Sequence, residues 1–106
     1  MSVAAAQPLP GPLAGIYARV PEHVVYRLFP QETVVLNLRT GKYHGLNPTA
    51  GRMLELLERG LSIGETAELV AGEYQRPLAD VEHDLQTFCA DLRERGLIEL
   101  SANVTS

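Results

Sequence analysis

The sequence has no tryptophan, a single cysteine and few basic residues, with nine Lys and Arg against thirteen Asp and Glu. Because Cys89 has no second cysteine to pair with, an internal disulfide is excluded and no oxidising compartment is implied. The net charge of −4 argues against nucleic acid or an anionic membrane as the partner. No run approaches the roughly 20 apolar residues that a membrane-spanning helix requires. We therefore expect a soluble, cytoplasmic protein.

The 106 residues suffice for one domain and leave no room for a second. Residues 1–15 are rich in Ala, Pro and Gly and carry no charge, which predicts a flexible N-terminal tail before a single folded domain over residues 16–101. The apolar start looks like an export signal, but it lacks a basic residue and contains Pro8, Pro10 and Pro12. We therefore do not expect export.

The first half of the domain has the pattern of a β-sheet, in segments rich in β-branched and aromatic residues. The predicted strands are residues 23–29, 33–38 and 43–46. Alternation in the second strand places Val34, Leu36 and Leu38 on one face. After it, Gly41 supplies the positive φ that a tight turn needs. The prediction is a three-stranded antiparallel meander.

The second half has the pattern of helices. They are predicted from Pro48 to about Arg59, from Ser62 to just before Pro77, and from about Leu78 to Arg95. Asn47 precedes a proline at the first helical position, and Ser62 and Glu65 have the spacing of a capping box. The third helix repeats apolar residues every three or four positions. A meander followed by three helices indicates an α+β domain resembling a winged helix-turn-helix.

No constellation of residues points to catalysis or to a metal. The spacing of His23, His44 and His83 does not gather them around one ion. Cys89 follows Phe88 in the third predicted helix, where a buried and inert thiol is expected. There is no glycine-rich phosphate loop. We therefore predict a protein that is not an enzyme and that needs no cofactor and no metal.

A winged-helix shape is compatible with binding duplex DNA, but the charge of the third predicted helix opposes it. Residues 78–92 contain four acidic residues and no lysine or arginine. Phosphate neutralisation supplies most of the affinity of such helices for DNA, so an acidic helix is repelled. DNA binding is therefore the weaker of the two functions that the shape allows.

The third predicted strand is better suited to binding a peptide. It forms an edge of the meander, and an open edge presents unpaired backbone groups to an incoming strand. Residues 43–46 are uncharged, and Gly45 gives close access to the backbone. An extended peptide would pair with this edge and place alternate side chains in a trough whose far wall is the third helix. Two alternatives stay open: the N-terminal tail or a second copy of the protein covers this edge.

Several segments, in their order along the chain, resemble the PqqD-like family of leader-recognition domains (RiPP recognition elements), which serve the biosynthesis of ribosomally made, modified peptides. They are residues 34–47 (VVLNLRTGKYHGLN), 50–57 (AGRMLELL), 62–67 (SIGETA) and 92–98 (LRERGLI). The resemblance covers roughly residues 20–100. It is the ordered series, rather than any single motif, that is specific.

The resemblance implies that residues 16–101 form a PqqD-like peptide-binding domain with no activity of its own. In this family the leader segment of a precursor peptide pairs antiparallel with the third strand and lies against the third helix. The implied strand contacts are Lys42, Tyr43, His44, Gly45 and Leu46. The implied helix contacts are Val81, Asp84, Leu85 and Phe88.

The segment at residues 36–47 is most similar to the small leader-binding component of lasso-peptide biosynthesis. The resemblance then implies three partners: the leader region of a precursor peptide, a leader-cleaving cysteine protease and an ATP-dependent cyclase. The alternative is a pyrroloquinoline-quinone biosynthesis protein that presents its peptide to a radical enzyme. The sequence of one domain does not separate the two, because the specificity lies in the partner peptide.

Overall fold

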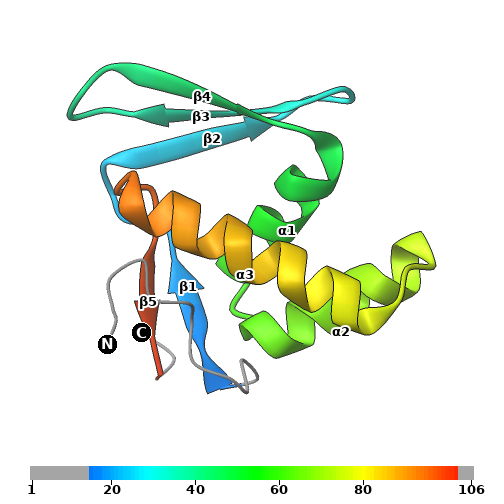
Figure 1. The fold of residues 1–106 in the computed structure, drawn as a ribbon. Helices are drawn as coiled ribbons and strands as arrows, with labels where there is room; N and C mark the ends of the chain where they lie inside the picture. The colour runs from blue at the N-terminus through cyan, green and yellow to red at the C-terminus, as the bar shows by residue number, and fades with distance from the viewer. Residues whose placement is uncertain (1–14, 103–106) are drawn as a thin grey trace.

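The structure is a computed structural model that describes residues 15–102 (Figure 1). Its elements are β1 (Tyr17–Arg19), β2 (Val24–Leu28), β3 (Thr33–Asn37), β4 (Lys42–Leu46), α1 (Pro48–Glu58), α2 (Ile63–Tyr74), α3 (Leu78–Glu94) and β5 (Glu99–Ser101). The antiparallel sheet β2-β3-β4 and the three helices confirm the predicted α+β class. The tail predicted for residues 1–15 lies outside the described residues, apart from Gly15.

A second, two-stranded sheet brings the two ends of the described chain together. In it β1 pairs antiparallel with β5, with Ala18 opposite Leu100. The sequence indicated only an extended segment at β5 and no strand at β1, because three residues are too few to show alternation. Because β1 pairs with β5, it does not cover an edge of the larger sheet β2-β3-β4.

The turn between β3 and β4 fixes the register of the hairpin. Gly41 has a φ of +75°, the left-handed conformation predicted for it. The side chain of Asn37 accepts a hydrogen bond from the backbone N–H of Arg39 at 2.9 Å. In the resulting register Val35 lies opposite His44.

One face of the β2-β3-β4 sheet enters the core and the other faces solvent. On β3 the core face carries Thr33, Val35 and Asn37, all buried. The apolar residues predicted to share a face lie together on the solvent side; they are Val34, Leu36 and Leu38. Because both faces of β3 contain apolar residues, alternation alone did not identify the inner one.

The helices α1 and α2 begin at the caps that the sequence indicated. The side chain of Asn47 accepts a hydrogen bond from the backbone N–H of Ala50 at 2.8 Å. Ser62 and Glu65 form the predicted capping box, each accepting from the backbone of the other. After α3, Gly96 turns the chain with a φ of +76°.

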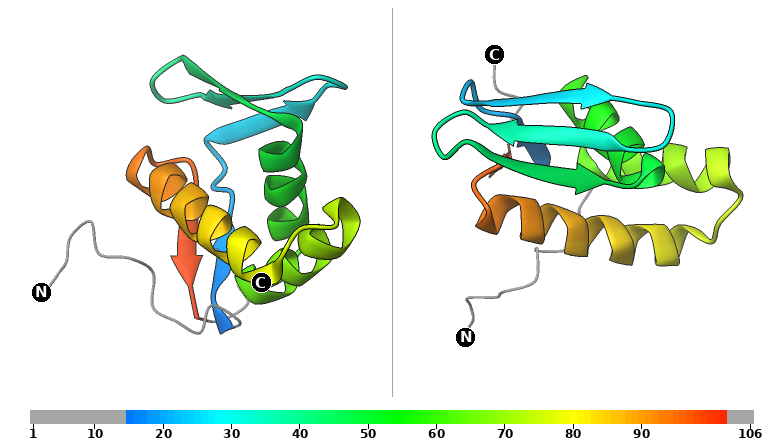
Figure 2. Two further views of the ribbon diagram at one scale, coloured as in Figure 1. Left: turned by 45° about the vertical axis from the view of Figure 1, so that its right-hand side comes forward. Right: turned by 90° about the horizontal axis from the view of Figure 1, so that it is seen from above.

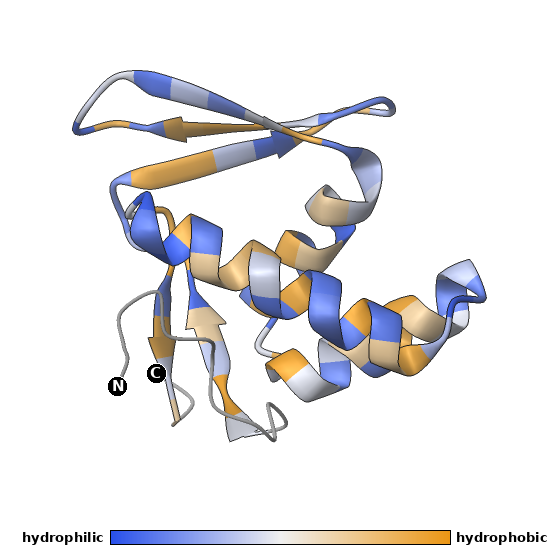
Figure 3. Ribbon diagram, viewed as in Figure 1, coloured by the Kyte–Doolittle hydropathy of each residue, from blue (hydrophilic) through white to orange (hydrophobic). Residues whose placement is uncertain are grey.

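The core lies between α1, α2, α3 and the inner face of the sheet, and α1 packs closely on β3. A Cβ added to Gly51 of α1 would stand 2.0 Å from Oγ1 of Thr33, so only glycine permits this approach. Along α3 hydrophilic and hydrophobic residues alternate, as expected for a helix with one buried side (Figure 3). None of the helices among residues 15–102 is both long enough and apolar enough to cross a membrane.

The helix α3 lies below the sheet in Figure 1 and on its β4 side in the view from above. Seen from above, the strands follow one another from α3 in the order β4, β3, β2, and β4 points in the direction opposite to α3 (Figure 2). The free edge of β4 is therefore on the side of the sheet where α3 runs, and we call the space between these two elements the candidate groove.

Candidate peptide-binding groove

The outer edge of β4 has no partner strand among residues 15–102, since β4 pairs only with β3. Just after β3, the backbone N–H of Leu38 donates to the carbonyl of His23 at 2.7 Å. Every second residue of β3, counted back from Leu38, therefore directs its backbone groups toward β2. Because hydrogen-bonded and non-hydrogen-bonded pairs alternate in an antiparallel ladder, the remaining residues of β3 turn theirs toward β4. The β4 residues whose backbone groups are left at the free edge are Tyr43 and Gly45.

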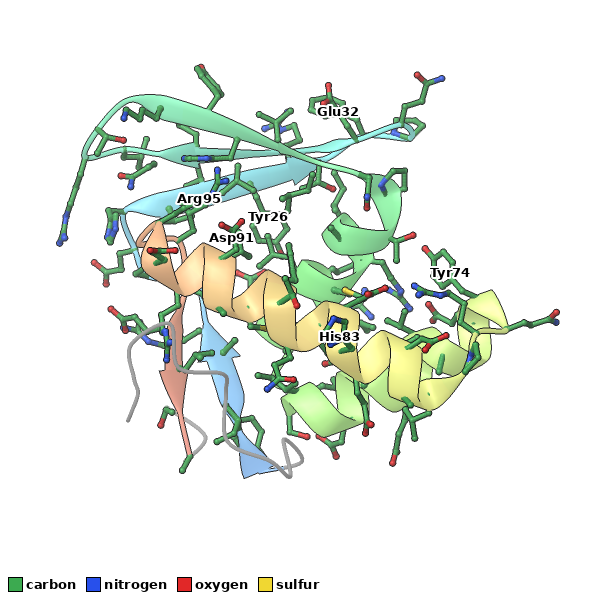
Figure 4. All side chains as sticks on the ribbon, viewed as in Figure 1. Tyr26, Glu32, Tyr74, His83, Asp91 and Arg95 are labelled. Carbon is green, nitrogen blue, oxygen red and sulfur yellow. The ribbon has the colours of Figure 1, made fainter. Side chains whose placement is uncertain are left out.

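The side chains of β4 divide between the two faces of the sheet. Those on the inner face, toward α3, are Lys42, His44 and Leu46. Tyr43 points to the solvent side, where its side chain is 71% exposed. A Cβ on Gly45 would also point to that side, 3.3 Å from Oε1 of Glu32, which lies above the sheet in Figure 4. Glycine at this position is therefore not what opens the space next to α3.

On α3 the predicted helix contacts belong to two different faces. Val81 and Leu85 are completely buried, with 0% of their surface exposed, so they support the groove from beneath and do not line it. Asp84 is exposed and Phe88 is half-buried, packed against the core. Of the four predicted helix contacts, only Asp84 and Phe88 therefore have surface that a bound peptide could reach.

A hollow of about 470 Å³ lies between the start of α1 and the middle of α3. Its floor is apolar, formed by Ala50 and Met53 of α1 and Phe88 of α3. Its rim is polar and includes Asp84, the second predicted residue that reaches this space. The other rim residues are Asn47, Thr49, Arg76, His83 and Thr87. No direct signal in the sequence identified Ala50 or Met53, because both also fit the apolar side of an ordinary core helix.

Two arginines border the groove, and each is held by an aspartate of α3. Arg76 donates to Asp84 at 2.7 Å next to the hollow. Arg95, at the other end of α3, donates from Nε to Asp91 at 3.1 Å. Asp84 and Asp91 are seven residues apart and therefore lie on one side of the helix, with Phe88 between them. Asp91 and Arg95 were missed from the sequence, although that spacing places them on the face of Asp84.

Arg95 also reaches across to the sheet. Its Nη1 lies 3.2 Å from Nδ1 of His44, so the C-terminal end of α3 and the middle of β4 are in contact. Figure 4 shows Arg95 and Asp91 beneath the sheet, at the end of α3 opposite the hollow. The hollow at the start of α1 and the contact between Arg95 and His44 therefore mark the two ends of the candidate groove.

Cys89 and Tyr26 have raised pKa values, and in both cases the largest cause is burial in the folded protein. Burial raises the pKa of the Cys89 thiol to about 12, which keeps it protonated at neutral pH. Burial and a hydrogen bond to Glu58 raise the pKa of Tyr26, which ties β2 to the end of α1. Within residues 15–102 no three His, Cys, Asp or Glu side chains are grouped so that they could hold a metal ion.

Residues 32–98 match the sequence model of a family described as coenzyme PQQ synthesis protein D (PqqD). Among solved structures, "TbiB1 in Complex with the TbiA(beta) Leader Peptide" is 33% identical, with a TM-score of 0.72 over 76% of this chain and 94% of that one. "Lasso peptide synthetase B1 complexed with the leader peptide" is 27% identical, with a TM-score of 0.72 over 77% and 96%. No curated protein sequence matches this chain.

Proposed function

The chain belongs to the PqqD family, and on that premise we propose that it binds the leader segment of a ribosomally made precursor peptide by adding it as a strand to β4. The observation that carries the proposal is the outer edge of β4, which no strand within residues 15–102 pairs with and which lies on the side of the sheet where α3 runs. Two similar solved structures, described as complexes with leader peptides, support the same occupant.

The leader would run antiparallel to β4 and therefore in the same direction as α3. Its backbone would pair with Tyr43 and Gly45, and alternate side chains would face Lys42, His44 and Leu46. Its N-terminal part would enter the hollow lined by Asp84 and Phe88, and its C-terminal part would leave beside Arg95. The main-chain pairing supplies affinity, and the hollow supplies selectivity for a side chain.

We assign the chain a non-catalytic role in lasso-peptide biosynthesis, in the cytoplasm. It holds the leader while a cysteine protease removes it and an ATP-dependent cyclase closes the ring. The similarity to the lasso peptide synthetase B1 structure supports this setting. The Cys89 thiol is buried and its pKa is raised, so it is not placed to act as a nucleophile. The family description favours a second candidate, presentation of a peptide to a radical enzyme in pyrroloquinoline-quinone synthesis.

The test uses a synthetic peptide with the leader sequence of the precursor encoded beside the gene for this chain, and a scrambled peptide of the same composition. Calorimetry measures binding, and mass spectrometry of the mixture detects cleavage. We expect saturable binding of the leader, none of the scrambled peptide, and an intact leader after incubation. Equal binding of both peptides contradicts leader recognition. Cleavage without added protease contradicts the non-catalytic role.

A further inference from the structure

Arg95 makes the contact between α3 and β4 that lies at the exit end of the groove. Its guanidinium uses two of its five N–H donors, one toward Asp91 and one toward His44. The side chain is still 51% exposed. An exposed cation with unused donors therefore stands beside the inner face of β4, where an added strand would bring a new side chain.

The ladder geometry places one position of an added strand next to this guanidinium. If Tyr43 and Gly45 bond to the added strand, the residue opposite His44 forms a non-hydrogen-bonded pair with it. In such a pair the two side chains lie on the same face, with Cβ atoms about 4.5–5.5 Å apart. The side chain opposite His44 is therefore directed toward α3, within reach of Arg95.

The present partners of Arg95 are weak compared with a carboxylate from a peptide. Asp91 is bound through a single N–H, and His44 contacts the guanidinium through one ring nitrogen only. A carboxylate can accept two parallel bonds from a guanidinium, and such charge-assisted bonds are about twice as strong as neutral ones. Lys42, two residues from His44 on the same face of β4, adds a second cation.

We propose that Arg95 is a specificity-determining residue, which selects a peptide carrying Asp or Glu at the position opposite His44. The proposal rests on the proposed function, since it needs a strand added to β4. Arg76 is the less suitable arginine, because it borders the hollow beyond the end of β4, where no strand edge remains to position a peptide.

The experiment uses the same leader peptide, with each position replaced in turn by Glu, Gln and Lys. Binding of every peptide is measured by fluorescence anisotropy to the full chain. For the wild type we expect one position at which Glu binds about fivefold more tightly than Gln, and Lys more weakly than Gln. In Arg95→Glu the preference at that position reverses, so that the Lys peptide binds more tightly than the Glu peptide.

Arg93→Glu is the matched control, because it makes the same change of charge in the same turn of α3. Arg93 lies two residues away and therefore on a different side of the helix. We expect it to keep the preference for Glu at the same position. Arg95→Gln, which adds no negative charge beside Asp91, should abolish the preference without reversing it. Circular dichroism establishes that each variant is folded.

The outcomes separate this proposal from the proposed function. If the wild type binds the leader but Glu and Gln are equal at every position, the role of Arg95 is wrong and the proposed function stands. The role of Arg95 is also wrong if Arg95→Glu and Arg93→Glu change the preference equally, since the effect then comes from net charge. If the wild type binds neither the leader nor any of its variants, both proposals fail.

Discussion

Gly45 presents its backbone N–H and C=O at the free edge of β4 and its Cα to the solvent side of the sheet. A substitution at this position can therefore change the backbone groups at the edge or add a side chain on the solvent side, and the two effects on binding can be measured separately. An added side chain would meet only the end of the flexible Glu32 side chain, at 3.3 Å, whereas removal of the N–H affects only the edge. One residue therefore distinguishes strand addition from binding elsewhere.

We expect Gly45→Pro to abolish leader binding, because proline removes a donor from the edge and puts its ring where the added strand approaches. Gly45→Ala keeps the N–H and should bind within a few-fold of the wild type. Calorimetry measures both, and circular dichroism with a thermal melt must show both folded. If folded Gly45→Pro binds at wild-type affinity, strand addition to β4 is wrong, and the edge of β2 becomes the candidate.

Cys89 offers an independent check of the core beneath the groove. Its thiol is completely buried and its pKa is raised to about 12, so almost no thiolate exists at pH 8. We expect no reaction with a thiol-specific dye at pH 8 in the native protein and one equivalent after unfolding in guanidinium chloride. Rapid labelling of the native protein would contradict the burial of this side of α3.

At the scale of elements, α1 joins the sheet to the helices, and its packing on β3 depends on Gly51. The sheet side of this contact is Thr33, a buried residue of β3. The next residue of α1, Arg52, forms ion pairs with Glu55 and with Glu73 of α2. Since α1 follows β4 directly, its position also determines where the hollow opens.

Gly51→Ala should lower the free energy of unfolding by about 1–3 kcal/mol, because the new Cβ overlaps Thr33 and α1 must move. Gly72→Ala in α2 is the matched change. Its Cβ meets nothing within 4 Å, so it should stabilise by about 0.5–1 kcal/mol. Urea denaturation measures both. Equal stability of the two variants would show that α1 does not approach β3 this closely.

The two faces of α3 predict different effects of truncation. Phe88→Ala removes a half-buried ring from the floor of the hollow and should weaken leader binding about tenfold. Leu85→Ala removes a completely buried side chain and should cost about 2–5 kcal/mol of stability, while the folded protein keeps its affinity. Binding is measured at a temperature below the unfolding midpoints of both variants, so that each is folded. A larger loss of affinity for Leu85→Ala would place the groove on the other face of α3.

At the scale of the whole molecule, the sequence predicted the elements that span many residues and missed the pairing of those that span few. The meander and all three helices span enough residues for alternation, caps and periodicity to be visible. The β1–β5 pair joins segments of three residues across most of the chain, so nothing local indicates it. The strand contacts and the helix contacts of the groove stay predictions. Periodicity defined the helix stripe that includes Val81 and Leu85, but it does not distinguish a core face from a peptide-binding face.

The charge of the whole molecule opposes binding to duplex DNA. The fold resembles a winged helix, but the net charge is −4, and the exposed face of α3 carries Glu82 and Asp84. Of the nearby cations, Arg76 and Arg95 are already paired with aspartates of α3. Approach to phosphates would therefore bring like charges together and release few counterions.

We expect no retarded band in a gel shift with duplex DNA at micromolar protein and about 50 mM salt, where non-specific contacts are strongest. The same preparation must bind the leader peptide, which shows that the protein is folded and active. A retarded band that disappears at higher salt would mean that the basic residues away from α3, such as Arg27 and Arg39, form a surface that outweighs the net charge. DNA binding would then compete with strand addition as the function of this fold.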